Sequence, residues 1–117
     1  MQRFRPAQRI CRRAEYQQIY AKGSRISGKY WTLFAVRNDR APAGRLGIAA
    51  TRKFGGAVSR NRAKRLIREV FRRNRIAAGY DVVVVPKRAL LDIELDRVEA
   101  EYAGSIQRLK TRTRAVQ

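Results

Sequence analysis

Histidine is absent from this chain of 117 residues, and cysteine occurs once, at Cys11. Without an imidazole, neither histidine-based acid–base catalysis nor histidine ligation of a metal ion is available. A single cysteine excludes a disulfide within the chain, which is typical of cytoplasmic proteins, and no motif around it indicates a nucleophile. We therefore expect a cytoplasmic protein in which Cys11 is a buried or incidental thiol.

Long apolar runs are also missing. No segment approaches the roughly 18 consecutive apolar residues that a membrane-spanning helix needs. The opening residues MQRFRPAQRIC lack the uninterrupted apolar segment of a signal peptide. We expect no membrane segment, and the length suits one domain with a modest core.

Acidic residues are few: nine Asp and Glu stand against 28 Lys and Arg, for a formal net charge of +19. A polyanion would neutralise this self-repulsion, so nucleic acid is the leading candidate partner and an anionic membrane surface the second. Arginine outnumbers lysine, and its planar fork can bind phosphate in two places and stack on bases. The composition therefore favours binding to structured RNA or DNA.

The positive charge is densest between Arg60 and Arg75, where eight basic residues accompany one acid, Glu69. Apolar residues recur there at spacings of three and four, which predicts an amphipathic helix. These apolar residues are Ala63, Leu66, Ile67, Val70 and Phe71. The opposite face would carry Asn61, Lys64, Arg65, Arg68 and Arg72. A merely solvated face would mix acids with bases, because like charges four residues apart repel each other. We therefore expect this face to bind a polyanion.

A first helix is predicted from Arg9 to Lys22, with Gly23 as its C-terminal cap. The residues of one stripe are Arg9, Arg13, Tyr16 and Tyr20. Ile10, Ala14 and Ile19 would anchor the helix to the core. Arginine and tyrosine on one stripe suit a stacking platform for single-stranded nucleic acid. The same tyrosines are equally compatible with half-buried core positions.

Two strands are predicted, at Lys29–Val36 and Arg45–Thr51, joined by a loop into a hairpin. Alternation in the first strand places Tyr30, Thr32, Phe34 and Val36 on one face and Trp31, Leu33 and Ala35 on the other. Small residues in the second strand, which leave room above the sheet, are Gly47, Ala49 and Thr51. The valines of Val82–Val85 predict a third strand, buried on both faces. Both faces of the first strand cannot be core, so we expect one face of the sheet to be partly open.

A last helix is predicted from Leu90 to Lys110, with an apolar stripe formed by Leu91, Leu95, Val98, Tyr102, Ile106 and Leu109. Five of the nine acids lie between Asp92 and Glu101, where they complement the helix dipole and face away from a polyanion. Residues 1–8 are expected to form an extended arm and residues 111–117 a frayed basic tail. The chain, 1–117, is thus predicted to be a single compact α+β domain in the order α-β-β-α-β-α.

No motif for catalysis is found. Asp39, Glu69, Asp81 and the acids of the last helix show no paired-carboxylate pattern for a two-metal nuclease. The glycines between Gly44 and Gly56 follow neither the P-loop pattern nor the dinucleotide-binding pattern. We therefore expect no catalytic residue in this chain.

The segment from Gly47 to Phe71 resembles the signature of the protein subunit of bacterial ribonuclease P. The residues that carry the resemblance are Gly47, Arg52-Lys53-Phe54-Gly55, Ala57-Val58, Arg60-Asn61-Arg62, Lys64-Arg65 and Arg68-Glu69-Val70-Phe71. The resemblance implies a fold like the second domain of ribosomal protein S5. It also implies a left-handed β-α-β crossover, where general statistics favour the right-handed one.

In that family the RNA subunit is the catalyst and uses bound Mg²⁺ to remove the 5′ leader of precursor tRNA. The resemblance implies that this chain binds the RNA subunit and the leader, and raises the affinity for substrate and Mg²⁺. The implied contacts to the RNA subunit are Arg60, Asn61, Arg62, Lys64, Arg65, Arg68 and Arg72. The implied leader cleft, between the first helix and the open sheet face, comprises Arg9, Arg13, Tyr16, Tyr20, Phe34, Thr51, Arg52 and Lys53. Tyr16 and Tyr20 stand where the family commonly has phenylalanine, which preserves stacking.

Two other functions remain open from the residues alone. The leading alternative is a structural, ribosomal-type RNA-binding protein with no role in cleavage, and a protein-only metal nuclease is more distant. A single-strand channel between the first helix and the sheet would favour the ribonuclease P subunit, because a ribosomal RNA-binding protein needs no such channel. No organic cofactor, membrane or stable protein partner is expected.

Overall fold

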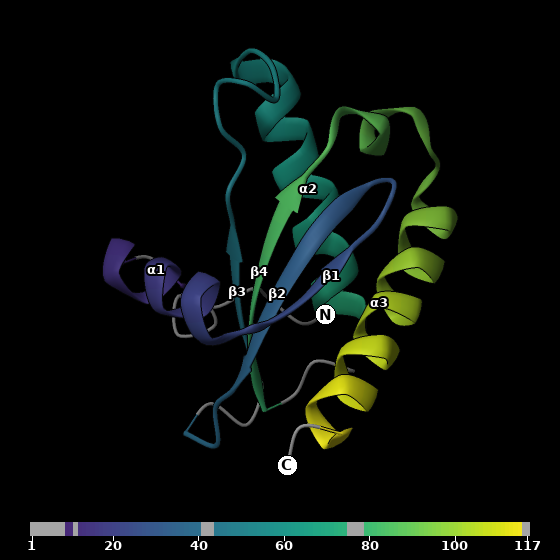
Figure 1. Ribbon diagram of the computed structural model, residues 1–117. Coiled ribbons are helices and arrows are strands. Elements are labelled where there is room, and N and C mark those ends of the chain that lie inside the picture. The colour runs from purple at the N-terminus through teal and green to yellow at the C-terminus, as the bar shows by residue number, and fades with distance from the viewer. Residues whose placement is uncertain (1–8, 11, 41–43, 75–78, 116–117) are drawn as a thin grey trace.

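A four-stranded sheet separates two layers of helices (Figure 1). The computed structural model describes residues 9–10, 12–40, 44–74 and 79–115. The elements, in chain order, are α1 (Arg13–Lys22), β1 (Ser24–Ser27), β2 (Trp31–Arg37), β3 (Arg45–Ile48), α2 (Ala57–Arg73), β4 (Tyr80–Pro86), the 3-10 helix η3 (Arg88–Asp92) and α3 (Leu95–Ala115). The predicted α+β order is confirmed, with β1 as an additional strand. The expectations for residues 1–8, Cys11, Arg75 and residues 116–117 lie outside the described residues.

The strand order is β1-β2-β4-β3, with β2 and β4 antiparallel and β3 and β4 parallel. The predicted hairpin between the strands now labelled β2 and β3 is therefore wrong, because β4 lies between them. A strand that is apolar on both faces is stabilised most at the centre of a sheet, and Val82, Val83 and Val84 are all at most 1% exposed. The parallel crossover β3-α2-β4 is confirmed, and its left-handed sense stays a prediction.

Strand β1 pairs antiparallel with β2, so the hairpin of this protein is β1-β2. Its sequence is Ser-Arg-Ile-Ser, in which only Ile26 is apolar and buried. A segment of four residues with one apolar side chain gives little indication of a strand in the sequence. This segment is extended because it pairs with β2. The sheet consequently extends one strand further than predicted.

The two faces of β2 pack against different layers, as the alternation predicted. Leu33 and Ala35 belong to the main core, which is shared with α2 and α3. Phe34 and Val36 pack in a smaller cluster with Ile10 and with Ile19 of α1. Tyr30 departs from the prediction: it precedes β2 and lies in the main core at 5% exposure, since the strand alternation begins only at Trp31.

Helix α2 lies on the main core through Ala63, Ile67, Val70 and Phe71, as predicted, while Leu66 is only half-buried. Helix α3 buries Val98, Tyr102, Ile106 and Leu109. The predicted bounds of this last helix are wrong at both ends. Leu90 lies in η3, the backbone of Ile93 is extended, and α3 then continues to Ala115, so residues 111–115 are helical rather than a frayed tail.

Helix α1 begins at Arg13, four residues later than predicted. Arg9 instead forms a parallel β-bridge with Leu46, and the Ile10 N–H donates to the Leu46 carbonyl at 2.9 Å. This pairing with the edge of β3 holds the backbone of Arg9 and Ile10 extended, and α1 therefore cannot begin at Arg9. Ile10 and Ile19 are buried as expected, whereas Ala14 is exposed and does not anchor the helix. Gly23 ends α1, with its N–H donating to the Ile19 carbonyl.

Candidate nucleic-acid interface

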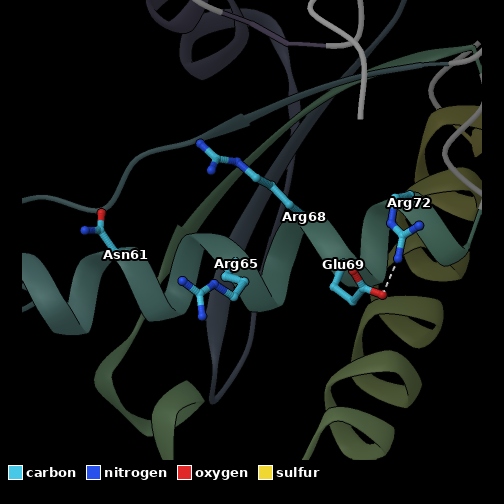
Figure 2. A pocket seen from close by; sticks show the side chains of 5 residues that line it. All are labelled: Asn61, Arg65, Arg68, Glu69 and Arg72. Atoms are coloured by element: carbon cyan, nitrogen blue, oxygen red, sulfur yellow. Dashed lines mark hydrogen bonds and ion pairs between the residues drawn. The ribbon is translucent and has the colours of Figure 1, made fainter. Parts of the chain in front are cut away.

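The outer face of α2 carries a row of cationic and amide side chains, opposite the stripe that the core buries. Asn61, Arg62, Arg65 and Arg68 are exposed, and Arg60, Lys64 and Arg72 are half-buried. A shallow depression of about 390 Å³ on this face is lined by Asn61, Arg65, Arg68, Glu69 and Arg72. Figure 2 shows these five side chains along α2. The helix therefore presents a concave, positively charged surface, with the residue placement that the spacing predicted.

Most of this charge is not neutralised by the protein itself. Arg72 pairs with Glu69, the one acid of the helix, and turns toward it in Figure 2. Arg65 and Arg68 form no ion pair with any carboxylate of the described residues. At the end of α2, Arg73 pairs with Glu99 of α3 at 2.9 Å, which links the two helices. Guanidinium groups without internal partners are suited to bind phosphate.

A row of three aromatic rings lies on the other face of the sheet, between α1 and β2. The ring centroids of Tyr16 and Tyr20 are 6.3 Å apart, and those of Tyr20 and Phe34 are 4.9 Å apart in an edge-to-face arrangement. Tyr20 is 40% exposed. Partial burial, with a smaller contribution from Tyr16, raises the pKa of Tyr20. The structure thus brings together the three aromatic residues predicted for the leader cleft.

The open space predicted above Gly47 is taken by Tyr16. A Cβ at Gly47 would lie 2.7 Å from Tyr16 Oη, so the ring rests directly on the glycine backbone. The Tyr16 hydroxyl also donates to the Ile10 carbonyl at 3.1 Å. The part of this face that remains open is its continuation past the rings, where Ala49 and Val85 are only half-buried.

A groove of about 230 Å³ connects the two sides of the molecule around the edge of β3. Arg9, Tyr16 and Gly47 line it on the α1 side, and Lys64 and Arg68 line it on the α2 side. The groove therefore joins the cationic face of α2 to the aromatic row. A nucleic acid bound at one surface would lie close to the other.

The remaining residues predicted for the cleft are not joined to the rings. Arg13 is exposed at the start of α1, and Thr51, Arg52 and Lys53 are exposed in a turn after β3 that the buried Phe54 anchors. Within the described parts of the chain, no hydrogen bond, ion pair or ring contact connects these four residues to the aromatic row. Their place in a leader cleft stays a prediction.

Two features near the aromatic row were missed by the sequence analysis. The Arg25 guanidinium carbon of β1 lies 5.9 Å from the centroid of the Phe34 ring.

Arg45 of β3 pairs with Asp81 of β4 and with Glu15 of α1, at 2.7 Å each. The hydrogen bond to Asp81 is the largest cause of the raised pKa of Arg45, desolvation opposes it, and Glu15 adds to it. Arg45 thus joins α1 to the sheet one residue before Tyr16.

The carboxylates do not gather into a metal-binding cluster: no group of three acids or thiols that could hold a metal ion occurs among the described residues. Asp81 accepts hydrogen bonds from Arg45 and Asn38, and Glu15 pairs with the same arginine.

No helix in the described ranges is long and apolar enough to cross a membrane.

Comparison with known proteins decides the family. The family model described as Ribonuclease P matches residues 4–110. This chain belongs to the ribonuclease P protein family. Ribonuclease P is an endoribonuclease that acts in tRNA processing, and its protein component works together with an RNA subunit. The alternative of a ribosomal RNA-binding protein is therefore wrong at the level of the family. The expectation that the active site lies in the RNA and not in this chain stays a prediction.

Similar ribonuclease P proteins agree in sequence and in fold. The ribonuclease P protein component of Oleidesulfovibrio alaskensis is 46% identical over 85 residues, covering 70% of this chain and 68% of the relative. That of Thermotoga maritima is 37% identical over 98 residues, covering 82% of each. The solved Thermotoga maritima protein superimposes with a TM-score of 0.76 at 31% identity, covering 86% of this chain and 96% of that one. A Staphylococcus aureus ribonuclease P protein mutant gives a TM-score of 0.79 at 30% identity, with 89% of each chain covered.

Proposed function

We propose that this chain is the non-catalytic subunit of ribonuclease P and binds the catalytic RNA through the outer face of α2. The active site and the Mg²⁺ ions that hydrolyse the phosphodiester then belong to the RNA. Support comes from Arg65 and Arg68, which are exposed and have no carboxylate partner among the described residues. Folded RNA supplies phosphates at a density that matches such a helix face. Four carboxylates, in contrast, pair with the protein's own arginines: Glu15, Glu69, Asp81 and Glu99.

We propose further that the aromatic row binds the single-stranded 5′ leader of precursor tRNA. The observation that carries this proposal is the cluster of Tyr16, Tyr20 and Phe34 beside a half-open sheet face. Exposed aromatic rings bind unpaired bases by stacking and need no particular sequence, whereas bases within a duplex are not available to them. A leader is the unpaired part of precursor tRNA, so the row would distinguish precursor from product.

The groove around β3 supports a way in which binding of the RNA subunit and binding of the leader would together raise the affinity for substrate. Arg9 lies at its α1 side, and Lys64 and Arg68 lie at its α2 side. A chain that binds the RNA subunit on α2 therefore holds the leader-binding row at a fixed position beside that RNA. Leader binding then becomes intramolecular within the complex, which increases the apparent affinity for precursor and for the Mg²⁺ bound with it. We place this holoenzyme in the cytoplasm, in line with the single cysteine, and propose no further stable protein partner.

The leader proposal is tested with the reconstituted holoenzyme and the variant Tyr20→Ala. We expect a loss of about 1–3 kcal/mol in binding of leader-bearing precursor, the usual size of one base–aromatic stack. Binding of mature tRNA, which has no leader, should be unchanged. The measurement is the equilibrium Kd of both tRNAs under single-turnover conditions.

Tyr20→Phe is the matched control, because it keeps the ring and removes only the hydroxyl. This variant should bind precursor as the wild type does. Equal losses for precursor and mature tRNA in Tyr20→Ala would mean that Tyr20 supports the fold or the RNA subunit, and the leader proposal would be rejected.

A further inference from the structure

Arg25 lies in register with a line of residues that crosses the sheet beneath α1. The pairing of the strands places Arg25 of β1 opposite Phe34 of β2, Phe34 opposite Val83 of β4, and Val83 opposite Gly47 of β3. Directly opposite residues on one sheet face have neighbouring side chains. Arg25 is exposed, and its guanidinium lies against Phe34. It is therefore the end of a continuous strip across the sheet.

The order of groups along this strip is fixed by the sheet. Tyr16 rests on Gly47 at the β3 edge, Tyr20 contacts Phe34 in the middle, and Arg25 lies on β1 at the opposite edge. An unpaired strand that crosses the sheet along α1 meets the rings first and a cation last. Stacking surfaces followed by a positive charge are the usual components of a single-strand channel.

The two ends of the strip have different surroundings. At the β3 end, the groove leads to Lys64 and Arg68 of α2, the face proposed to bind the RNA subunit. At the β1 end, α3 packs against the strand on the opposite face of the sheet, where Ile26 belongs to the main core. In the proposed function the cleavage site lies with the RNA subunit, so the leader would enter at β3. Arg25 then meets the leader nucleotides furthest from the cleavage site.

We propose that Arg25 binds a phosphate at the outer end of the leader and thereby sets how many leader nucleotides the protein holds. This inference rests on the proposed leader function and adds a direction and a length to it. A guanidinium can keep its face against an aromatic ring while its N–H edge binds phosphate oxygens. The ring of Phe34 would hold the fork in place for that contact.

The test is the affinity of the reconstituted holoenzyme for precursors whose leaders are lengthened one nucleotide at a time. For the wild type, affinity should rise with leader length and then level off. For Arg25→Gln, the rise should stop at a shorter leader, with a roughly tenfold weaker Kd for the longest leaders, as one lost contact of about 1.4 kcal/mol would produce. For Arg25→Gln with long leaders, the slope of log K against log salt should be smaller in magnitude by about 0.7, the value for one phosphate contact to a single strand. Arg25→Lys should keep most of the affinity because it keeps the charge.

Lys29→Ala is the matched control. Lys29 Nζ lies 5.7 Å from the ring centroid of Tyr30 in the same hairpin, but Tyr30 belongs to the main core on the other face of the sheet. Removing this cation should leave the whole leader-length curve unchanged. If Lys29→Ala lowered the affinity as Arg25→Gln does, the effect would be one of general charge, and the assignment to Arg25 would be overturned.

Failure of this inference and failure of the leader proposal give different results. An Arg25→Gln curve that matches the wild type, or that is lowered equally at every length, overturns the role of Arg25 while the Tyr20→Ala effect persists. A wild-type curve that is flat from the first nucleotide overturns the leader cleft itself, and Arg25 with it. Thermal unfolding of Arg25→Gln and Arg25→Lys verifies that both variants are folded.

Discussion

The ring of Tyr16 lies directly on the backbone of Gly47, with its hydroxyl 2.7 Å from the point that a Cβ would occupy. This contact sets the position of the first ring of the aromatic row relative to β3. It also links the row to the N-terminal segment, because the same hydroxyl donates to the Ile10 carbonyl. A glycine in the strand is therefore required by the ring that covers it.

Gly47→Ala should displace Tyr16 and leave the fold intact. The atoms that the new methyl group meets belong to the outer part of a side chain, so the ring can move while the strand stays in place. We expect weaker binding of leader-bearing precursor by roughly 1 kcal/mol or more, the lower end of one stacking contact. Equilibrium binding of precursor and mature tRNA measures it.

Tyr16→Phe separates the ring from its hydrogen bond in the same assay. It keeps the stacking surface over Gly47, so precursor binding should stay close to that of the wild type. If Gly47→Ala bound precursor normally, the position of Tyr16 would be irrelevant to the leader.

The cluster of Arg45, Asp81 and Glu15 should be the main electrostatic contribution to stability. Among the described residues, Arg45→Met leaves Asp81, which is 7% exposed, with only the Asn38 amide as a side-chain partner. Removing one member of a buried pair costs about 3 kcal/mol because the other charge stays desolvated. The free energy of unfolding in urea measures this loss.

A surface pair provides the comparison for that experiment. Arg37 and Asp39 are also bonded, at 3.3 Å, but their side chains are 61% and 84% exposed. Arg37→Ala should therefore change the free energy of unfolding by no more than about 0.5 kcal/mol. Equal losses in the two variants would show that the buried cluster has no special role.

Arg65→Ala and Arg68→Ala should each weaken binding to the RNA subunit and reduce its salt dependence. The expected change is roughly one unit of slope in log K against log salt for each lost phosphate contact. Arg97→Ala, on the exposed face of α3, removes the same charge elsewhere and should keep the wild-type slope. Unchanged slopes in both α2 variants would contradict an RNA contact on this face.

The sequence predicted those elements in which local pattern and tertiary packing agree. The spacing of Ala63, Ile67 and Val70 defines the buried side of α2 and, by exclusion, its cationic side. The valines of β4 identified a strand buried on both faces. Phe34 and Leu33 were assigned correctly to opposite sides of the sheet because alternation is a local property of an extended backbone.

Features that depend on distant partners could not be predicted in this way. The strand at Ser24–Ser27 exists because β2 offers it an edge, and its own residues give little signal. With this strand unpredicted, Arg25 was missed as well. Arg9 has a helical spacing to Arg13 but is held extended by Leu46, and the placement of β4 between β2 and β3 follows from the fold as a whole.

The most direct measurement is cleavage of leader-bearing precursor tRNA at low Mg²⁺ by the RNA subunit alone, by this protein alone and by the two together. The account predicts rapid cleavage by the complex, slow or undetectable cleavage by the RNA alone, and none by the protein alone. Cleavage by the purified protein without RNA would contradict the assignment of the active site. A rate for the complex no higher than that of the RNA alone would contradict the supporting role of the protein.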